Sequence, residues 1–297
     1  MPPCIDPDND RSGPLVSVVI PTRNRARLLE RALQSVLAQT YRKLDVLVVD
    51  DASEDDTPEV VRQVGDARVR YLRHAVRKGG GAARNTGIDA AQGVYVAFLD
   101  DDDQWKPRKI ERQLEHIAGR AAAICGFTLY RDGVETPGSR RGGGDAAVTG
   151  RMLRRTVIGW GTSTFMVRSE VARRVRFDEE LGSGQDWDFL SRLFADSGIA
   201  YVDEPLVTFD VGGHARITSA SFDLPPTHAE NRLRIFYKHA DFFGPFWFNY
   251  HVASRLLYRV RERRDASRHL LAAIRRCGVI PVLVGFVNRF YQKTFGY

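Results

Sequence analysis

The chain has 297 residues, of which 43% are hydrophobic and 27% are charged, the balance of an ordinary globular protein with a sizeable core. Its formal net charge of +7 is compatible with nucleic acid, anionic lipid or a nucleotide-linked substrate as partner. The three cysteines are far apart and lack metal-binding spacing. This pattern favours a reducing compartment with buried or incidental thiols.

The two ends of the chain bear on its location. Residues 1–14 are polar and rich in proline and aspartate, so we expect a disordered lead-in and no signal peptide. Near the other end, the longest apolar run, 279–287, contains a proline and is too short to span a membrane. We therefore expect a cytoplasmic protein.

Apolar runs alternate with helical patterns over the first hundred residues. We expect buried strands at 16–20, 44–49, 69–72 and 94–99. Between them, helices are predicted at 28–37, after the turn at 53–56, and at 82–91. This alternation predicts an α/β fold with a mostly parallel sheet.

The pattern loosens after residue 107. A helix is expected at 109–117, a strand at 121–129, and a glycine-rich loop at 131–145. Two further strands, at 164–167 and 206–209, should flank a helix at 186–195. From about residue 225 onward the chain is helical in pattern and rich in aromatic residues and arginine, which predicts a C-terminal helical extension.

Polar residues follow three of the expected strands, in the runs 22–24, 50–51 and 100–103. Because parallel strands share a direction, these residues should lie at one edge of the sheet, where ligands bind in such folds. The carboxylate pair suits hydrogen bonds to a base or ribose. The tetrad suits a diphosphate bound through Mg²⁺ or Mn²⁺. Taken alone, each acidic run also fits a solvated turn that caps the next helix.

A glycine loop, 79–81, precedes Arg84. Glycines let a backbone approach a ligand closely, and the arginine can pair with a phosphate or a carboxylate. The dinucleotide-binding fingerprint does not fit, because Arg84 occupies the position of its third glycine and the loop follows the third strand. A plain flexible connection is the alternative.

Together these segments resemble the family 2 glycosyltransferases with the glycosyltransferase A fold. The matching segments are 18–24, 49–53, 83–88 with Gly93, 98–107, 177–181 and 185–189, and the resemblance runs from Val16 to about Ser219. It implies a single Rossmann-like fold with a mostly parallel central sheet. We expect a lead-in (1–14), a nucleotide-sugar-binding half (15–104), an acceptor-binding half (105–222) and the helical extension (223–297).

The resemblance also implies roles for particular residues. The nucleotide contacts are Pro21, Thr22, Arg23, Asn24, Asp50, Asp51, Arg84, Asp100 and Asp101. The Asp-x-Asp motif of the family falls on Asp100 and Asp102, which would hold Mg²⁺ or Mn²⁺ together with His214, in a loop over the diphosphate. Asp186 matches the catalytic base, although Gln185 stands where the family often has Glu. For His214 an ordinary surface histidine is the alternative, and for Asp186 a helix-start acid.

The acceptor half supplies four expected contacts: Trp160, Thr162, Ser163 and Trp187. Core packing of Trp160 is an equal alternative. The implied activity is an inverting transfer from a nucleotide sugar, a UDP-sugar, to a hydroxyl of a glycan or lipid-linked oligosaccharide in cell-surface polysaccharide synthesis. A nucleotidyltransferase and a catalytically silent nucleotide-sugar-binding module are the rivals.

The carboxyl-terminal segment 240–297 interleaves aromatic residues with arginines. Such a pattern suits an interfacial helix on an anionic membrane, here at the inner face of the plasma membrane. A helical cap on the catalytic domain is the alternative. Nucleic acid is not an expected partner, because the residues at the strand ends are mostly acidic.

Overall fold

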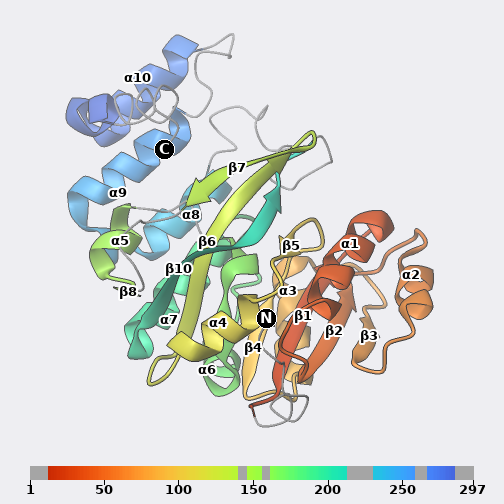
Figure 1. Cartoon of the computed structure of the whole chain (residues 1–297). Helices are drawn as coiled ribbons and strands as arrows, with labels where there is room; N and C mark the ends of the chain where they lie inside the picture. Colours follow the sequence, from red (N-terminus) through yellow and green to blue (C-terminus); the bar gives the residue numbers. More distant parts are fainter. Residues whose placement is uncertain (1–12, 140–145, 156–160, 213–229, 258–265, 285–297) are drawn as a thin grey trace. The chain divides into compact units, whose positions relative to one another are not determined.

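The computed structural model describes residues 13–139, 146–155, 161–212, 230–257 and 266–284 (Figure 1). The chain divides into two compact units. The sheet unit comprises residues 1–148, 158–179 and 186–212, and the helical unit comprises 149–157, 180–185 and 213–297. The two are described separately below.

The sheet unit begins with four parallel strands in the order β3-β2-β1-β4. They are β1 (Val16–Thr22), β2 (Leu44–Asp50), β3 (Val69–Arg73) and β4 (Tyr95–Phe98). The connecting helices are α1 (Ala26–Leu37), α2 (Thr57–Val64) and α3 (Gly80–Ala90). Strands β1, β2 and β4 are buried throughout, as their mostly apolar sequences indicate. The expected α/β fold is confirmed.

Two glycines allow close approach around β1. A Cβ atom on Gly87 of α3 would lie 2.3 Å from the side chain of Val19, so only glycine lets this helix pack on β1. A Cβ atom on Gly93 would lie 2.5 Å from the backbone nitrogen of Ser17. Both glycines belong to the segments that carry the family resemblance, and both have a packing reason to be there.

The second part of the sheet contains both parallel and antiparallel strand pairs. Its longest pairing, between β6 (Ala122–Arg131) and β10 (Ile199–Asp210), is parallel. Strand β9 (Met166–Arg168) joins the two parts, because it runs antiparallel to both β4 and β6. The remaining elements are β5 (Gln104–Trp105), β8 (Ala146–Ala147), α4 (Lys109–His116), the 3₁₀ turn η2 (Thr162–Thr164), α6 (Ser169–Val175) and α7 (Gln185–Ser197).

The expected glycine-rich loop at 131–145 is wrong in part. Val134–Ser139 form β7, which pairs antiparallel with β6. The turn between them is Asp132-Gly133, and both residues have positive φ, 49° and 88°. An Asp-Gly pair in this conformation is a strong hairpin signal, because its twist matches that of the flanking strands. The overlooked dipeptide therefore accounts for the error.

The helical unit contains α5 (Gly150–Arg155), α8 (Glu230–Lys238), α9 (Ala240–Leu256) and α10 (Ala266–Cys277), so the predicted C-terminal helices are confirmed. Helix α9 is kinked at Gly244, which has φ 68° and precedes a proline. Phe236 and Phe243 pack around the buried ring of His251, at 5.7 and 5.0 Å between ring centres. In the described parts of the chain, no helix combines the length and hydrophobicity that crossing a membrane requires.

Candidate active site

The polar residues after β1, β2 and β4 meet at one edge of the sheet, as the parallel register predicts. Thr22 donates its hydroxyl hydrogen to Asp101, at 2.8 Å. The backbone nitrogen of Asp51 donates to the carbonyl oxygen of Thr22, at 2.9 Å. Three segments that are far apart in the sequence thus form one connected polar cluster.

Asn24 joins the first two strand ends. Its backbone nitrogen donates to the Ser53 hydroxyl at 2.9 Å, and its side-chain oxygen accepts from the backbone of Glu54 at 2.8 Å. Asn24 has φ 53°, a left-handed conformation that asparagine adopts more readily than most residues. Its side chain therefore holds a bent backbone and is exposed to solvent at the same time.

Asp50 and Asp51 are both buried, and each organises a loop. Asp50 accepts hydrogen bonds from the backbone of Ser53 at 2.8 Å and from the Tyr71 hydroxyl at 2.5 Å. Asp51 accepts from the backbone nitrogens of Lys78 and Gly79, both at 2.7 Å. Burial by itself would raise the pKa of Asp51, but these bonds and His74 outweigh it and lower the pKa. Asp51 is therefore held ionised, with the glycine loop fastened to it.

His74 is a member of this cluster that the sequence analysis missed. Its Nδ1 lies 2.8 Å from Asp51, and its Nε2 lies 2.9 Å from the hydroxyl of Thr86 on α3. The ring is buried and links the end of β2 to α3. A single histidine after a strand carries no local signal of such a partner, so only the fold reveals its role.

Two arginines neutralise the first three acids of the tetrad. Arg25 lies 2.9 Å from Asp101 and 3.1 Å from Asp102, and Arg84 lies 2.5 Å from Asp100. Burial, together with the charge of Asp102, raises the pKa of Asp101 to about 6, although Arg25 and Thr22 act against this rise. The sequence analysis included Arg84 but missed Arg25, whose partners lie far along the chain.

The four acids differ in accessibility. The side chain of Asp101 is 7% exposed and Asp103 is buried, whereas the side chains of Asp100 and Asp102 are 30% and 15% exposed. Asp103 accepts from the Ser163 hydroxyl at 2.5 Å, and that hydroxyl accepts from the backbone nitrogen of Asp100 at 3.0 Å. Asp100 and Asp102, the two more exposed acids, are thus the residues that match the Asp-x-Asp motif of the family.

Asp186 lies in the first turn of α7, half-buried, and its carboxylate accepts from the backbone nitrogen of Trp187 at 2.8 Å. One turn later, Phe189 stacks on Phe177 with 4.1 Å between ring centres and meets Phe98 edge-on at 5.9 Å. Phe98 is the last residue of β4, directly before the tetrad segment. This aromatic cluster holds the beginning of α7 beside the acidic end of β4.

Asn85 supports the same cluster and was not among the expected site residues. Its side chain exchanges two hydrogen bonds with the backbone of Phe177, both at 2.9 Å, and donates to Glu179 at 2.7 Å. The guanidinium of Arg84 lies 5.4 Å from the centre of the Phe177 ring. The neighbouring pair Arg84 and Asn85 therefore positions both the tetrad and the segment that precedes α7.

Three of the four expected acceptor contacts are buried in the structure. Thr162 and Ser163 are buried in η2, and Trp187 is buried in α7. The Ser163 hydroxyl is engaged by the tetrad, and its carbonyl oxygen accepts from Trp105 at 2.9 Å. All three therefore present little surface to an acceptor in this structure. Trp160 and His214 lie outside the described residues.

The donor set fits a divalent cation that is shared with a ligand. Within the described ranges, no three His, Cys, Asp or Glu side chains are grouped so that they could hold a metal ion by themselves. Mg²⁺ is usually bound by only one or two carboxylates together with substrate phosphates and water, and Mn²⁺ prefers the same oxygen donors. Asp100 and Asp102, the two more accessible acids, meet this requirement once a diphosphate supplies further oxygens.

Comparison with known sequences identifies relatives that are named as glycosyltransferases. The chain is 28% identical over 282 residues to WcaA of Escherichia coli (strain K12), a glycosyl transferase named for colanic acid biosynthesis, covering 89% of this chain and 94% of that protein. It is 36% identical over 103 residues to the Escherichia coli enzyme WfaP, covering 35% and 41% of the two chains. WfaP is named as a UDP-Glc:alpha-D-GlcNAc-diphosphoundecaprenol beta-1,3-glucosyltransferase.

Solved structures with the same fold bind nucleotide sugars. TarS 1-349 of S. aureus, in complex with UDP-GlcNAc, superposes with a TM-score of 0.63 at 21% identity, covering 75% of this chain and 66% of that chain. The mannosyltransferase PcManGT of Pyrobaculum calidifontis, in complex with GDP-Man and Mn²⁺, gives 0.61 at 21% identity, covering 96% and 82%. Residues 17–182 match the sequence profile of glycosyl transferase family 2. The profile match covers more than half of the sequence, and the chain has the glycosyltransferase A fold. The chain therefore belongs to glycosyl transferase family 2.

Proposed function

We propose that this glycosyltransferase moves a sugar from a UDP-sugar to a hydroxyl of a glycan or lipid-linked oligosaccharide during cell-surface polysaccharide synthesis. The observation that carries the proposal is the aromatic cluster, which joins a half-buried carboxylate at the beginning of α7 to the acidic end of β4. Transfer needs a nucleotide site and a base in one place. The names of WcaA and WfaP support the polysaccharide context and the lipid-linked acceptor.

The strand-end cluster would bind the donor nucleotide. Asp51 holds the backbone of Lys78 and Gly79, so the glycine loop is fixed where a backbone can approach a ligand closely. The remaining strand-end residues, Pro21 to Asn24 and Asp50, would shape the base and ribose site around it. Arg84, held between Asp100 and the ring of Phe177, is placed to exchange its carboxylate partner for phosphate oxygens.

Asp102 and Asp100 would hold Mg²⁺ or Mn²⁺, and His214 stays a predicted third ligand. The cation, when bound, supplies Lewis-acid stabilisation of the departing nucleotide diphosphate. Arg25 keeps Asp102 and its neighbour Asp101 in place. The structure of PcManGT contains Mn²⁺, which supports the proposal that this chain also uses a divalent metal ion.

Asp186 would act as the general base. Its carboxylate accepts the proton of the acceptor hydroxyl while the hydroxyl oxygen attacks the anomeric carbon from the side opposite the diphosphate, so the configuration inverts. A position in the first turn of a helix favours the ionised carboxylate that a base requires. General base catalysis contributes roughly 10²–10⁴-fold in rate. We place this reaction at the inner face of the plasma membrane.

The test compares Asp186→Asn with Asp188→Asn. Asp186→Asn keeps the shape of the side chain but removes the proton acceptor, so turnover should fall by about 10²-fold or more while the Kd for the donor, measured by titration calorimetry, hardly changes. A UDP-sugar panel identifies the donor beforehand.

Asp188→Asn is the matched control. Asp188 is buried and pairs with Arg192 at 2.5 Å, so its substitution should lower the Tm and leave turnover per folded molecule near the wild-type value. Survival of turnover in Asp186→Asn, or loss of donor binding in the same variant, would refute the assignment of the base.

A further inference from the structure

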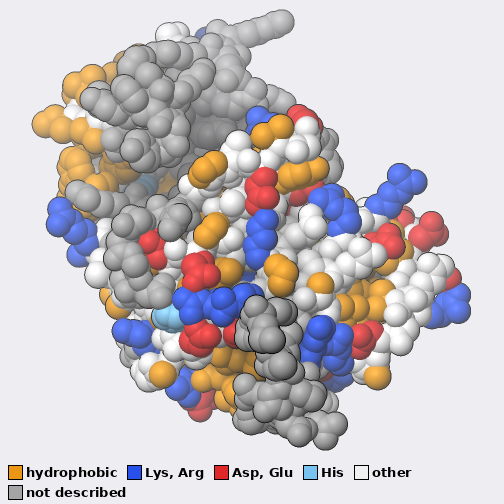
Figure 2. Space-filling model, in the orientation of Figure 1, with side chains coloured by type: hydrophobic (Ala, Val, Ile, Leu, Met, Phe, Trp, Pro, Cys, Tyr) orange, Lys and Arg blue, Asp and Glu red, His pale blue; other side chains and the backbone are white. Residues whose placement is uncertain are grey.

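The end of the helical unit carries exposed apolar side chains in one short stretch. Leu271 of α10 is 48% exposed, and beyond Gly278 the exposed fractions are 53% for Val279, 68% for Ile280 and 57% for Leu283. A single exposed leucine needs no explanation, but a group of large aliphatic side chains in one segment does. Figure 2 shows hydrophobic side chains at the margin of the molecule where Figure 1 draws α10.

Other apolar side chains of the same segment are the ones that pack into the core. Ala273 and Cys277 of α10 are buried, and so are Pro281 and Val282, which follow the helix. The inward-facing positions are therefore already filled by other apolar residues of the same segment. Leu271, Val279, Ile280 and Leu283 keep about half or more of their surface exposed, and exposing apolar side chains to water is unfavourable.

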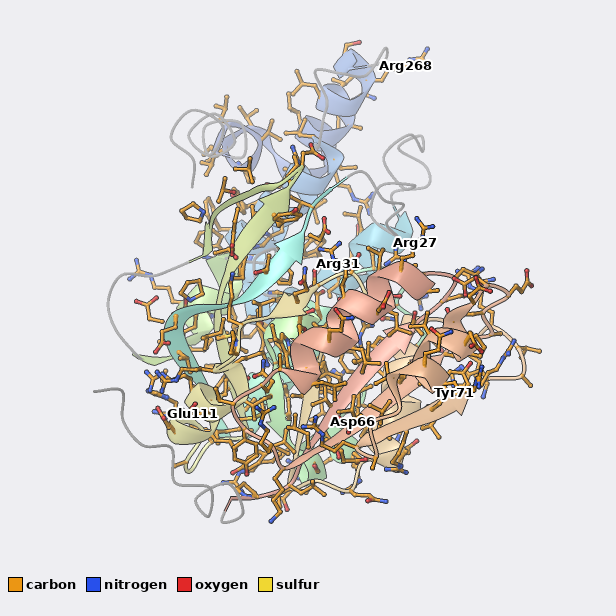
Figure 3. All side chains as sticks on the ribbon, turned by 45° about the vertical axis from the view of Figure 1, so that its right-hand side comes forward. Arg27, Arg31, Asp66, Tyr71, Glu111 and Arg268 are labelled. Carbon is orange, nitrogen blue, oxygen red and sulfur yellow. The ribbon has the colours of Figure 1, made fainter. Side chains whose placement is uncertain are left out.

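Arginines accompany the exposed aliphatic residues. Arg268, Arg275 and Arg276 of α10 are exposed, and Figure 3 shows Arg268 at the far end of the helix. The guanidinium of Arg276 lies 5.4 Å from the centre of the ring of Tyr237, itself 45% exposed. From residue 266 to residue 297 the sequence contains neither Asp nor Glu. The segment thus combines positive charge with apolar surface, and no acid offsets the charge.

This combination distinguishes between partners. A nucleic acid would be attracted by the arginines, but it would leave Ile280 and Leu283 unused. A purely apolar protein partner would leave the arginines without counter-charges. An anionic lipid bilayer satisfies both, because apolar side chains enter the boundary between headgroups and acyl chains while arginines contact lipid phosphates.

We propose that Leu271, Val279, Ile280 and Leu283, together with Arg268 and Arg275, form a reversible anchor on bilayers that contain anionic phospholipid. The anchor specifies the contact by which the enzyme reaches the membrane. It rests on the peripheral location proposed above and does not depend on the transfer chemistry. A protein held in this way would leave the membrane at high salt, since attraction to the lipid surface is screened within a Debye length.

The experiment measures co-sedimentation of the full chain with vesicles, without donor or acceptor. Vesicles of equimolar phosphatidylcholine and phosphatidylglycerol should bind the protein, and vesicles of phosphatidylcholine alone should bind it at least about tenfold more weakly. The double variant Ile280→Glu/Leu283→Glu should lose about tenfold or more of the anionic-vesicle affinity, because carboxylates replace the inserting side chains. Arg268→Gln/Arg275→Gln should bind more weakly and lose part of the salt dependence.

The sheet unit supplies matched controls. Val76 and Val134 are 65% and 60% exposed there, so Val76→Glu/Val134→Glu adds the same charge at equally exposed positions and should bind vesicles as the wild type does. Unchanged circular dichroism and unchanged donor affinity in every variant separate loss of the anchor from loss of the fold or of the nucleotide site.

Three outcomes would overturn the anchor. They are equal binding to neutral and anionic vesicles, no sedimentation with either, and an equal loss of affinity in the control variant. Light scattering adds a fourth: a dimer that Ile280→Glu/Leu283→Glu dissociates would show that a second copy of the chain covers this surface instead. Loss of anchoring with transfer to a water-soluble acceptor intact would leave the proposed reaction standing.

Discussion

The acids of the strand-end cluster fall into two groups that differ in depth. The inner acids, Asp50, Asp51, Asp101 and Asp103, are buried, and each accepts hydrogen bonds from neighbouring loops or hydroxyls. The outer acids, Asp100, Asp102 and Asp186, retain exposed surface. Burial of a carboxylate is unfavourable unless its oxygens are satisfied. The inner acids therefore hold the shape of the cluster, whereas the outer acids keep the surface that their proposed roles require.

The largest expected effect comes from an outer acid. Asp102→Asn should lower turnover by about 10²-fold or more and abolish the Mn²⁺-dependent part of nucleotide affinity, because a neutral amide is a poor ligand for a hard cation. Titration of the nucleotide diphosphate with and without Mn²⁺ measures the effect. Asp103→Asn, one residue away on the inner side, should lower the Tm and keep the Mn²⁺ dependence. Retained Mn²⁺ dependence in Asp102→Asn would remove the distinction between the two groups.

An inner acid and its cation should be strongly coupled in stability. A double-mutant cycle of Arg25→Met and Asp101→Asn should give an interaction free energy of about 1–3 kcal/mol, since Arg25→Met leaves the buried carboxylate of Asp101 without this cation. Urea unfolding of the four proteins measures it. If the two single effects on the unfolding free energy add, Arg25 and Asp101 do not stabilise each other, and Arg25 acts on Asp102 alone.

A smaller effect is expected from the hydroxyl that links the two groups. Ser163→Ala removes a donor to Asp103 and an acceptor for the backbone of Asp100, and should cost about 1–2 kcal/mol of unfolding free energy. The neighbouring, equally buried Thr162→Val is the control and should cost less. If the two variants unfold at the same urea concentration, the hydroxyl bridge does not stabilise the tetrad.

A buried cation extends the comparison, because Lys109 has no carboxylate partner among the described residues. Its Nζ donates to Gln113 at 2.7 Å and lies 3.9 Å from the centre of the Trp105 ring. Burial lowers the pKa of Lys109 to about 7. Between this value and the ordinary 10.5 the unfolded chain binds more protons, so unfolding free energy should rise as the pH rises through that window.

Lys109→Met tests this expectation by removing the titrating group while keeping the volume of the side chain. The difference between the urea midpoints of the wild type and the variant should change steadily from about pH 7 to pH 10, with the wild type gaining. A difference independent of pH over this range would mean that Lys109 stays protonated in the folded protein.

The sequence by itself determined the elements of the first hundred residues and their order, because the apolar runs of β1, β2 and β4 and the spacing of α1 follow from local periodicity. It also determined that acids gather at one sheet edge, since parallel strands share a direction. The dipeptide Asp132-Gly133 also predicts the turn of the β6–β7 hairpin from local sequence alone.

Only the tertiary structure decided which acids face inward and what holds them. Consecutive residues of the tetrad have different surroundings, so their depth depends on η2 and on Arg25, which come from elsewhere in the chain. Arg25 meets acids that lie more than seventy residues away, and His74 reaches α3 as well as Asp51. Such partners carry no local signal, because a side chain's pKa and accessibility are set by neighbours in space and not by neighbours in sequence.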